Sequence, residues 1–174
     1  HPGKEGIGSI ILANKAARQL KIPVLAAGGI TDGRGLVAAL ALGAAGVTMG
    51  TRIIATKACV IHDNFKNWII KATENDTALC HKSINHMVRV ANNVAAKKCL
   101  EMEAKGATLE ELMTVIAGKI SKECYKTGDV DGCMFVVGES IGLIGEIKTA
   151  KEVIDEIMAE AEAVMGVLKE EHVN

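Results

Sequence analysis

The chain has 174 residues, of which 49% are hydrophobic, so it can bury a sizeable core. Its formal net charge of −1 excludes the basic stripe that nucleic-acid binding needs, and no apolar run approaches the roughly 20 residues of a membrane span. Five widely spaced cysteines without a CxxC pair favour neither a disulfide framework nor a metal site. We therefore expect a cytoplasmic protein that binds a small molecule, and neither nucleic acid nor membrane.

The first part of the chain has the pattern of a parallel βαβ unit. Apolar residues at helical spacing predict a first helix with Ser9 as its N-cap. Two short apolar runs bounded by glycine predict strands buried on both faces, with a glycine-rich loop and an alanine-rich helix between them. Such a unit has parallel strands and a right-handed crossover. The expected elements are a helix over 9–20, a strand over 22–27, a loop over 28–35, a helix over 36–42 and a strand over 46–50.

The remainder of the chain is predicted to be mostly helical. Thr108 and Glu111 have the spacing of a capping box at the start of one helix. The stretch 77–92 contains a polar-apolar alternation, which indicates either an irregular excursion or a short strand. The expected helices cover 56–72, 94–105, 108–126 and 149–171.

Both predicted strands end in glycine, one at Gly28-Gly29 and the other at Gly50, which Thr51 follows. The carboxyl ends of parallel strands lie at one edge of a sheet, where α/β folds bind ligands. Glycine leaves backbone N–H groups bare for a phosphate, and the helix that starts near Arg34 is expected to direct its N-terminus at the same place. Taken singly, these glycines fit a tight turn or a packing position. Together they predict a phosphate cup, to which the Thr51 hydroxyl adds a donor.

The run from Ile22 to Asp76, which begins IPVLAAGGITDGRG and contains GVTMGTR, resembles the nitronate monooxygenase family. The opening HPGKEGI resembles the family's histidine loop, and GESIGLI at 138–144 resembles its late GQSAGLI segment. The resemblance implies an α/β fold, the C-terminal part of an FMN-binding (β/α)8 TIM barrel followed by a helical C-terminal region. Within one domain it implies barrel strands and phosphate loops over 1–76, a mostly helical excursion over 77–146 and a C-terminal helix over 147–174.

The resemblance also implies the cofactor and its binding residues. FMN would place its phosphate at Gly28, Gly29, Gly50 and Thr51, with Ala27 beside it.

The family's catalytic histidine corresponds to His1. With an ordinary pKa of about 6.5, histidine can take a proton from the carbon next to a nitro group or hold an anionic nitronate. The Pro2-Gly3 that follows favours nitronate oxidation. The alternative interpretation is that His1 is only a terminal residue. At position 139 the family usually has glutamine, whereas this chain has Glu139, so an amide contact there is not carried over.

For several other polar residues the sequence allows either a structural or a functional role. Arg52 directly follows the cup and faces either the phosphate or a surface partner. The other four histidines lack metal-ligand spacing, and the cysteines are expected to be small buried hydrophobic residues.

The implied function is FMN-dependent oxidation of a nitronate or nitroalkane with O₂, and a homodimer is one assembly compatible with it. A second interpretation is an FMN- and NADH-dependent enoyl-acyl-carrier-protein reductase, because such enzymes share the barrel and most of these motifs. A third is a piece of a longer protein without activity of its own. The chain starts inside a glycine-rich loop, and half a barrel leaves strand edges unpaired.

Overall fold

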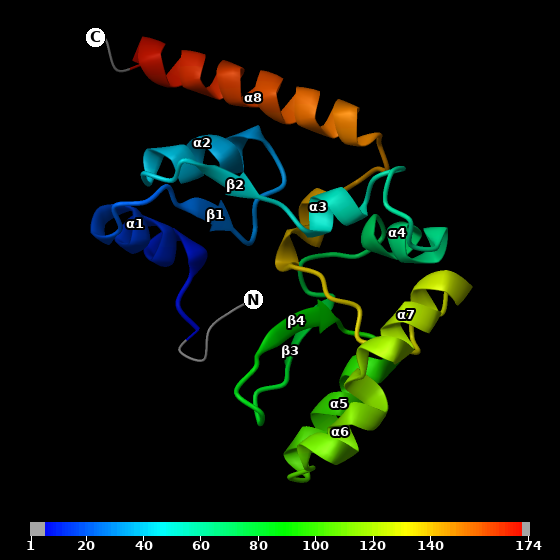
Figure 1. Ribbon diagram of the computed structural model, residues 1–174. Coiled ribbons are helices and arrows are strands. Elements are labelled where there is room, and N and C mark those ends of the chain that lie inside the picture. Colours follow the sequence, from blue (N-terminus) through cyan, green and yellow to red (C-terminus); the bar gives the residue numbers. More distant parts are fainter. Residues whose placement is uncertain (1–5, 172–174) are drawn as a thin grey trace.

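A computed structural model describes residues 6–171, and its first four elements form the expected βαβ unit (Figure 1). Strands β1 and β2 pair in parallel, with Leu25 opposite Gly46 and Ala27 opposite Thr48. This confirms the prediction of parallel strands joined through a helix. The elements are α1 (Ser9–Gln19), β1 (Leu25–Ala27), α2 (Gly33–Ala41) and β2 (Gly46–Thr48).

The starts of the two helices differ from the prediction. Ser9 is the first residue of α1 rather than its N-cap, because Gly8 holds the cap position and makes no side-chain bond. Helix α2 begins three residues before the predicted Leu36, since the Asp32 carboxylate accepts a hydrogen bond from the Gly35 N–H at 2.8 Å. Gly33 and Gly35 of the predicted loop therefore belong to the first turn of the helix, whereas Gly28 and Gly29 remain in a loop.

The prediction that both strands are buried on both faces is wrong, because two of the three residues of β1 are exposed and no residue of β2 is fully buried. Ala26 packs with alanines of α1 and α2, while the neighbouring Leu25 is 60% exposed. The helices cover one face of the two-stranded sheet, and Leu25 and Ala27 on the other face border an open cavity. In this structure the strand therefore has one buried and one open face.

The second part of the chain contains an antiparallel hairpin, β3 paired with β4, and six helical segments before the last helix. The hairpin confirms the strand interpretation of 77–92, so the stretch 77–146 is not wholly helical. The elements are α3 (Thr51–Ile54), α4 (Asp63–Ile69), β3 (Thr77–Cys80), β4 (Val88–Ala91), α5 (Val94–Ala104), α6 (Leu109–Ile116), α7 (Gly118–Thr127), the 3-10 helix η1 (Glu139–Leu143) and α8 (Ala150–Glu171).

One predicted helix is shorter in the structure, and another is divided in two. Only Asp63–Ile69 of the predicted helix 56–72 is helical, because Thr56 instead bridges to Lys148 and bonds its hydroxyl to a preceding carbonyl. The predicted helix 108–126 is interrupted at Ala117, whose extended backbone separates α6 from α7. At Thr56 a tertiary contact therefore overrides the helical periodicity. The capping box of Thr108 and Glu111 is confirmed.

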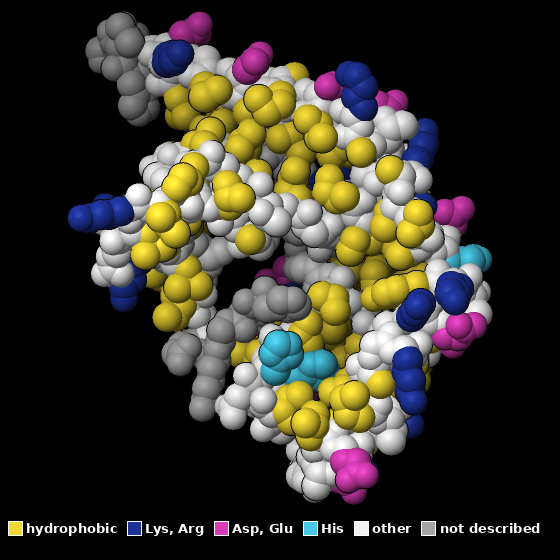
Figure 2. Space-filling model, in the orientation of Figure 1, with side chains coloured by type: hydrophobic (Ala, Val, Ile, Leu, Met, Phe, Trp, Pro, Cys, Tyr) yellow, Lys and Arg dark blue, Asp and Glu magenta, His cyan; other side chains and the backbone are white. Residues whose placement is uncertain are grey.

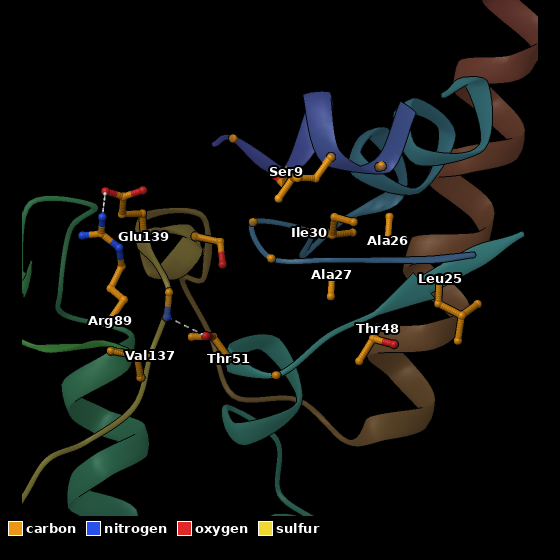
Figure 3. A pocket seen from close by; sticks show the side chains of 18 of the residues that line it. Ser9, Leu25, Ala26, Ala27, Ile30, Thr48, Thr51, Arg89, Val137 and Glu139 are labelled. Carbon is orange, nitrogen blue, oxygen red and sulfur yellow. Dashed lines mark hydrogen bonds and ion pairs between the residues drawn. The ribbon is translucent and has the colours of Figure 1, made fainter. Parts of the chain in front are cut away.

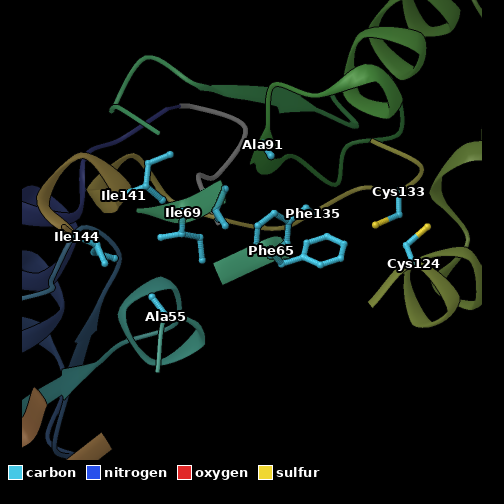
Figure 4. Packing of buried hydrophobic residues seen from close by; sticks show 10 residues of the cluster. Ala55, Phe65, Ile69, Ala91, Cys124, Cys133, Phe135, Ile141 and Ile144 are labelled. Carbon is cyan, nitrogen blue, oxygen red and sulfur yellow. The ribbon is translucent and has the colours of Figure 1, made fainter. Parts of the chain in front are cut away.

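The hydrophobic core lies between α4, β4 and the chain that leads to η1. Phe65 and Phe135 meet edge to face with ring centroids 4.8 Å apart, and Ile69 and Ile141 are fully buried beside them (Figure 4). This core fixes η1 beside the hairpin. None of the helices within residues 6–171 is long and apolar enough to cross a membrane.

Helix α8 lies along α2 on the far side of the βαβ unit (Figure 1). Its buried residues are spaced four apart, at Val153, Ile157 and Ala161. A Cβ at Gly33 would stand 2.4 Å from the Ala161 nitrogen, so only glycine permits this close approach. The expected C-terminal helix is thus present and braces α2.

Candidate functional site

An open cavity of about 770 Å³ lies between the βαβ unit and the hairpin with η1. The space-filling view shows this hollow (Figure 2), and the close-up shows the residues on its two sides (Figure 3). One wall consists of residues 6–16, β1 with the loop after it, and residues from 48 to 54. The other consists of Arg89 on β4, Tyr125 on α7 and the segment 136–140. We call these the glycine wall and the charged wall.

The glycine wall contains the residues of the predicted cup. Ala27, Gly28, Gly29, Gly50 and Thr51 all line the cavity, so the structure brings the two strand ends together as expected. Gly28 and Gly29 have φ values of +94° and +79°, which other residues adopt only with strain. A Cβ at either of them, or at Gly50, would meet no atom within 4 Å. Their backbone therefore faces free space that a side chain would fill.

Thr51 connects the two walls. Its side chain is buried, and its Oγ1 accepts a hydrogen bond from the Gly138 N–H at 2.9 Å (Figure 3). Because the hydroxyl oxygen is the acceptor in this bond, its hydrogen stays available for donation to a ligand. Thr51 thus lies among the residues of the predicted cup and also holds Gly138, the residue before η1.

The expected contribution of the α2 N-terminus is wrong. The Gly33 N–H donates to Glu160 Oε2 at 2.8 Å, and the Gly35 N–H donates to Asp32. Arg34 also bonds Glu160, at 3.2 Å. Protein carboxylates therefore occupy this helix end, and the predicted cup is left with the glycine loops and the Thr51 hydroxyl.

Arg52 faces away from the cup. Both of its terminal nitrogens donate to the Glu146 carbonyl at 3.2 Å, and it lines a second cavity of about 310 Å³ behind the glycine wall. Burial lowers the pKa of Arg52, while Glu146 and Glu156 raise it. Of the two interpretations that the sequence left open, the phosphate contact is excluded by this geometry, and the side chain ties α3 to the chain before α8.

The charged wall contains an ion pair that the sequence pattern did not reveal. Arg89 Nη2 lies 3.0 Å from Glu139 Oε1 (Figure 3). Arg89 Nη1 also donates to Thr77 Oγ1 at 2.9 Å. Ser140 and Tyr125 also line this wall. The alternation at 87–90 was the sequence signal for β4, but nothing in it indicated which residue Arg89 would face.

The remaining sequence-predicted residues have simple outcomes. His1 lies outside the described residues, so its role stays a prediction. His62 caps α4 by accepting from the Asn64 N–H at 3.1 Å. In the described part of the chain no cluster of histidine, cysteine, aspartate and glutamate could hold a metal ion.

The cysteines are buried as expected, except for the half-buried Cys59. Burial raises the pKa of the Cys80 thiol to about 12, and the pKa of Cys133 is raised to about 12 mainly for the same reason. Both therefore stay protonated at neutral pH and are poor nucleophiles.

A family model described as nitronate monooxygenase matches residues 1–160. A probable nitronate monooxygenase of Staphylococcus saprophyticus is 29% identical over 92% of this chain and 44% of its own length. An indene carboxyl-CoA dehydrogenase of Rhodococcus jostii is 28% identical over 89% of this chain and 54% of its own length.

Among solved structures, FabK from Thermotoga maritima is similar to this chain with a TM-score of 0.88. It is 37% identical over 94% of this chain and 51% of its own length. The chain therefore spans about half the length of the relatives it matches.

Proposed function

The chain belongs to the nitronate monooxygenase family, and from that premise we propose that its cavity binds FMN for the oxidation of alkyl nitronates with O₂. The observation that carries the proposal is the glycine wall. Gly28, Gly29 and Gly50 stand at the carboxyl ends of two parallel strands and border free space. This is the region where (β/α)8 barrels commonly bind phosphate.

The residues present fit a phosphate group. Bare backbone at Gly28, Gly29 and Gly50 permits an anion to approach N–H donors, and the Thr51 hydroxyl keeps a hydrogen to donate. Ala27 is small and lies beside them on the cavity. Bound there, FMN supplies the electron-transfer chemistry, which no side chain of the protein can perform.

The protein's own contribution to the reaction is proton transfer and orientation. We propose His1 as the base that removes the proton next to the nitro group of a neutral nitroalkane. A nitronate already lacks that proton, so histidine then serves only to hold the anion. The family model includes residue 1, which supports this assignment.

We also propose that activity requires a polypeptide that supplies the preceding barrel strands, called the complete protein below. The relatives are about twice as long, and Leu25 on β1 and Ile22 before it are exposed in this chain. Early βα loops of a barrel would cover the ligand in this cavity.

A second candidate function is reduction of an enoyl thioester. The neighbour FabK, an enoyl-acyl-carrier-protein reductase, is 37% identical over 94% of the chain, and the Rhodococcus relative is named for a CoA ester. This function needs a pyridine nucleotide as the electron donor, whereas nitronate oxidation does not.

The experiment that tests the proposal measures flavin reduction in the complete, FMN-loaded protein without O₂. If the proposal is right, propyl-2-nitronate bleaches the flavin rapidly and NADH does so slowly. Rapid bleaching by NADH, followed by reoxidation with crotonyl-CoA, would contradict it and favour the reductase.

The assignment of His1 is tested by His1→Asn with a nitroalkane and its pre-formed nitronate. A lost general base lowers kcat/KM for the neutral nitroalkane about 10²–10⁴-fold and affects the nitronate much less. Equal small losses for both substrates would mean that His1 is not the base.

A further inference from the structure

Arg89 and Glu139 are the only residues with a formal charge among those of the 6–171 range that line the large cavity. The rest of the lining is apolar, glycine, or hydroxyl-bearing. Because the two charges form an ion pair, they cancel, and neither is needed to balance another charged group of the cavity wall. Exposed ion pairs contribute little to the stability of a fold. The position of this pair, facing the glycine wall, is therefore better explained by a role in binding.

The two partners are held very differently. The Arg89 side chain is 23% exposed, and Thr77 fixes its guanidinium from the neighbouring strand of the hairpin. The Glu139 carboxylate is 61% exposed, and within the described chain the bond to Arg89 is the only one its side chain makes. The arginine is therefore held in place in the wall, whereas the carboxylate can move away from it at a small cost in free energy.

The geometry of the pair indicates which ligand Arg89 accepts. A guanidinium binds planar anions with two oxygens particularly well, because its N–H groups form a matching fork. The Glu139 carboxylate is such an anion and occupies the place that an external one would take. Nitronates and carboxylates share this shape and charge.

We propose that Arg89 is a binding site for a small planar oxyanion in the cavity, and that Glu139 is an internal competitor that the ligand displaces. The proposal rests on the proposed function only in naming the nitronate as one such anion. Displacement is reversible and needs no chemistry. Its cost is set by the Arg89–Glu139 pair, which at this exposure weakens binding of an external anion by about fivefold at most.

The test uses the complete, FMN-loaded protein and nitrate, a planar oxyanion whose binding is followed by perturbation of the flavin absorbance and by calorimetry. Glu139→Gln removes the competing charge while keeping the size of the side chain. It should tighten nitrate binding roughly two- to fivefold. Arg89→Met should weaken nitrate binding at least about tenfold, because a charge-assisted hydrogen bond is lost.

The double variant distinguishes competition from a general change of charge. If Glu139 acts through Arg89, Glu139→Gln has no effect in the Arg89→Met protein. The matched control is Glu123→Gln, which removes a similarly exposed carboxylate from an ion pair on α7 and should leave nitrate binding unchanged. FMN content verifies that each variant folds, and Arg89→Gln replaces Arg89→Met if that variant does not.

Two results would overturn the proposal. One is an equal gain from Glu139→Gln with and without Arg89, and the other is unchanged nitrate affinity in both arginine variants. These outcomes are separate from the fate of the proposed function. A protein that binds nitrate through Arg89 yet fails to oxidise nitronates would retain the anion site and lose only the reaction.

Discussion

The two walls of the cavity are built by different means. The glycine wall consists of backbone at the ends of two adjacent strands. Its N–H groups are accessible because Gly28, Gly29 and Gly50 have no side chains. The charged wall uses two long side chains, Arg89 from the hairpin and Glu139 from η1, that meet only after folding. A site made from backbone leaves a local signal in the sequence, whereas a site made from side chains depends on tertiary contacts that a local pattern does not encode.

The largest expected effect tests whether a glycine next to the glycine wall has a different role from the glycines in it. Gly33 lies in the same glycine-rich stretch but faces α8 rather than the cavity. Gly33→Val should force α8 away from α2 and cost roughly 3 kcal/mol of stability, which lowers the unfolding midpoint by about 5–10 °C. The measurement is thermal unfolding of the complete protein.

Gly166→Val on α8 is the matched control, because a Cβ there meets no atom within 4 Å. It should leave the midpoint nearly unchanged. A Gly33→Val protein as stable as the control would refute the packing role, and Gly33 would then have to be reconsidered as part of the ligand site.

A smaller loss of stability and binding is expected from changes at Thr51, which joins the two walls. Thr51→Val removes the acceptor of the Gly138 N–H, and a lost hydrogen bond of this kind costs about 1–3 kcal/mol. Thr51→Ser keeps the oxygen and should behave like the wild type. We expect Thr51→Val to weaken binding of both FMN and nitrate, measured by titration, since it affects both walls. Loss of FMN affinity alone would mean that the bond to Gly138 does not position the charged wall.

The smallest predicted effect concerns His81, which follows β3 with a φ of +65° and a buried, unpartnered Nε2. Burial lowers the pKa of His81, although Glu103 raises it in part. The unfolded chain therefore takes up the proton first as the pH falls below 6.5, and the folded state loses stability in that range.

His81→Asn removes the titrating group, and asparagine tolerates a positive φ. The variant should reduce the drop in unfolding midpoint between pH 7.5 and 5.5 by a measurable amount, up to about 2 °C. An identical pH dependence in both proteins would show that His81 is not the responsible group.

The contrast between the walls also explains how far the sequence was informative. The βαβ unit, the last helix and the meeting of the two glycine-bearing strand ends at one cavity were predictable, because periodicity and paired glycines act over short distances. The helix expected at 56–72 failed because Thr56 bridges to Lys148, a partner that no local pattern indicates. The prediction that the N-terminus of α2 faces the cup failed for the same reason, because the Gly33 N–H donates to Glu160 of α8.

Of the two charged residues in the charged wall, the sequence drew attention to Glu139 but not to Arg89. Glu139 was noticeable because it departs from the glutamine usual in the resembling segment. Arg89 lay in an alternating stretch whose pairing partner was unknown, so its orientation toward the cavity was not predictable. Val88 and Val90 pack in a cluster with Leu112 and Val115 of α6, so Arg89 between them faces the other way, and these partners lie more than 20 residues along the chain.

The central claim is that the glycine wall recognises the phosphate of FMN, and Gly50→Val tests it most directly. Gly50 has an ordinary φ of −93°, so valine fills the free space without the strain expected at Gly28. The dissociation constants of FMN and of riboflavin, which lacks the phosphate, are compared in wild type and variant, with Gly118→Val as a control away from the cavity. We predict that FMN affinity falls about 100-fold or more while riboflavin affinity changes less than about twofold. Equal losses for both flavins, or no loss for either, would contradict the account.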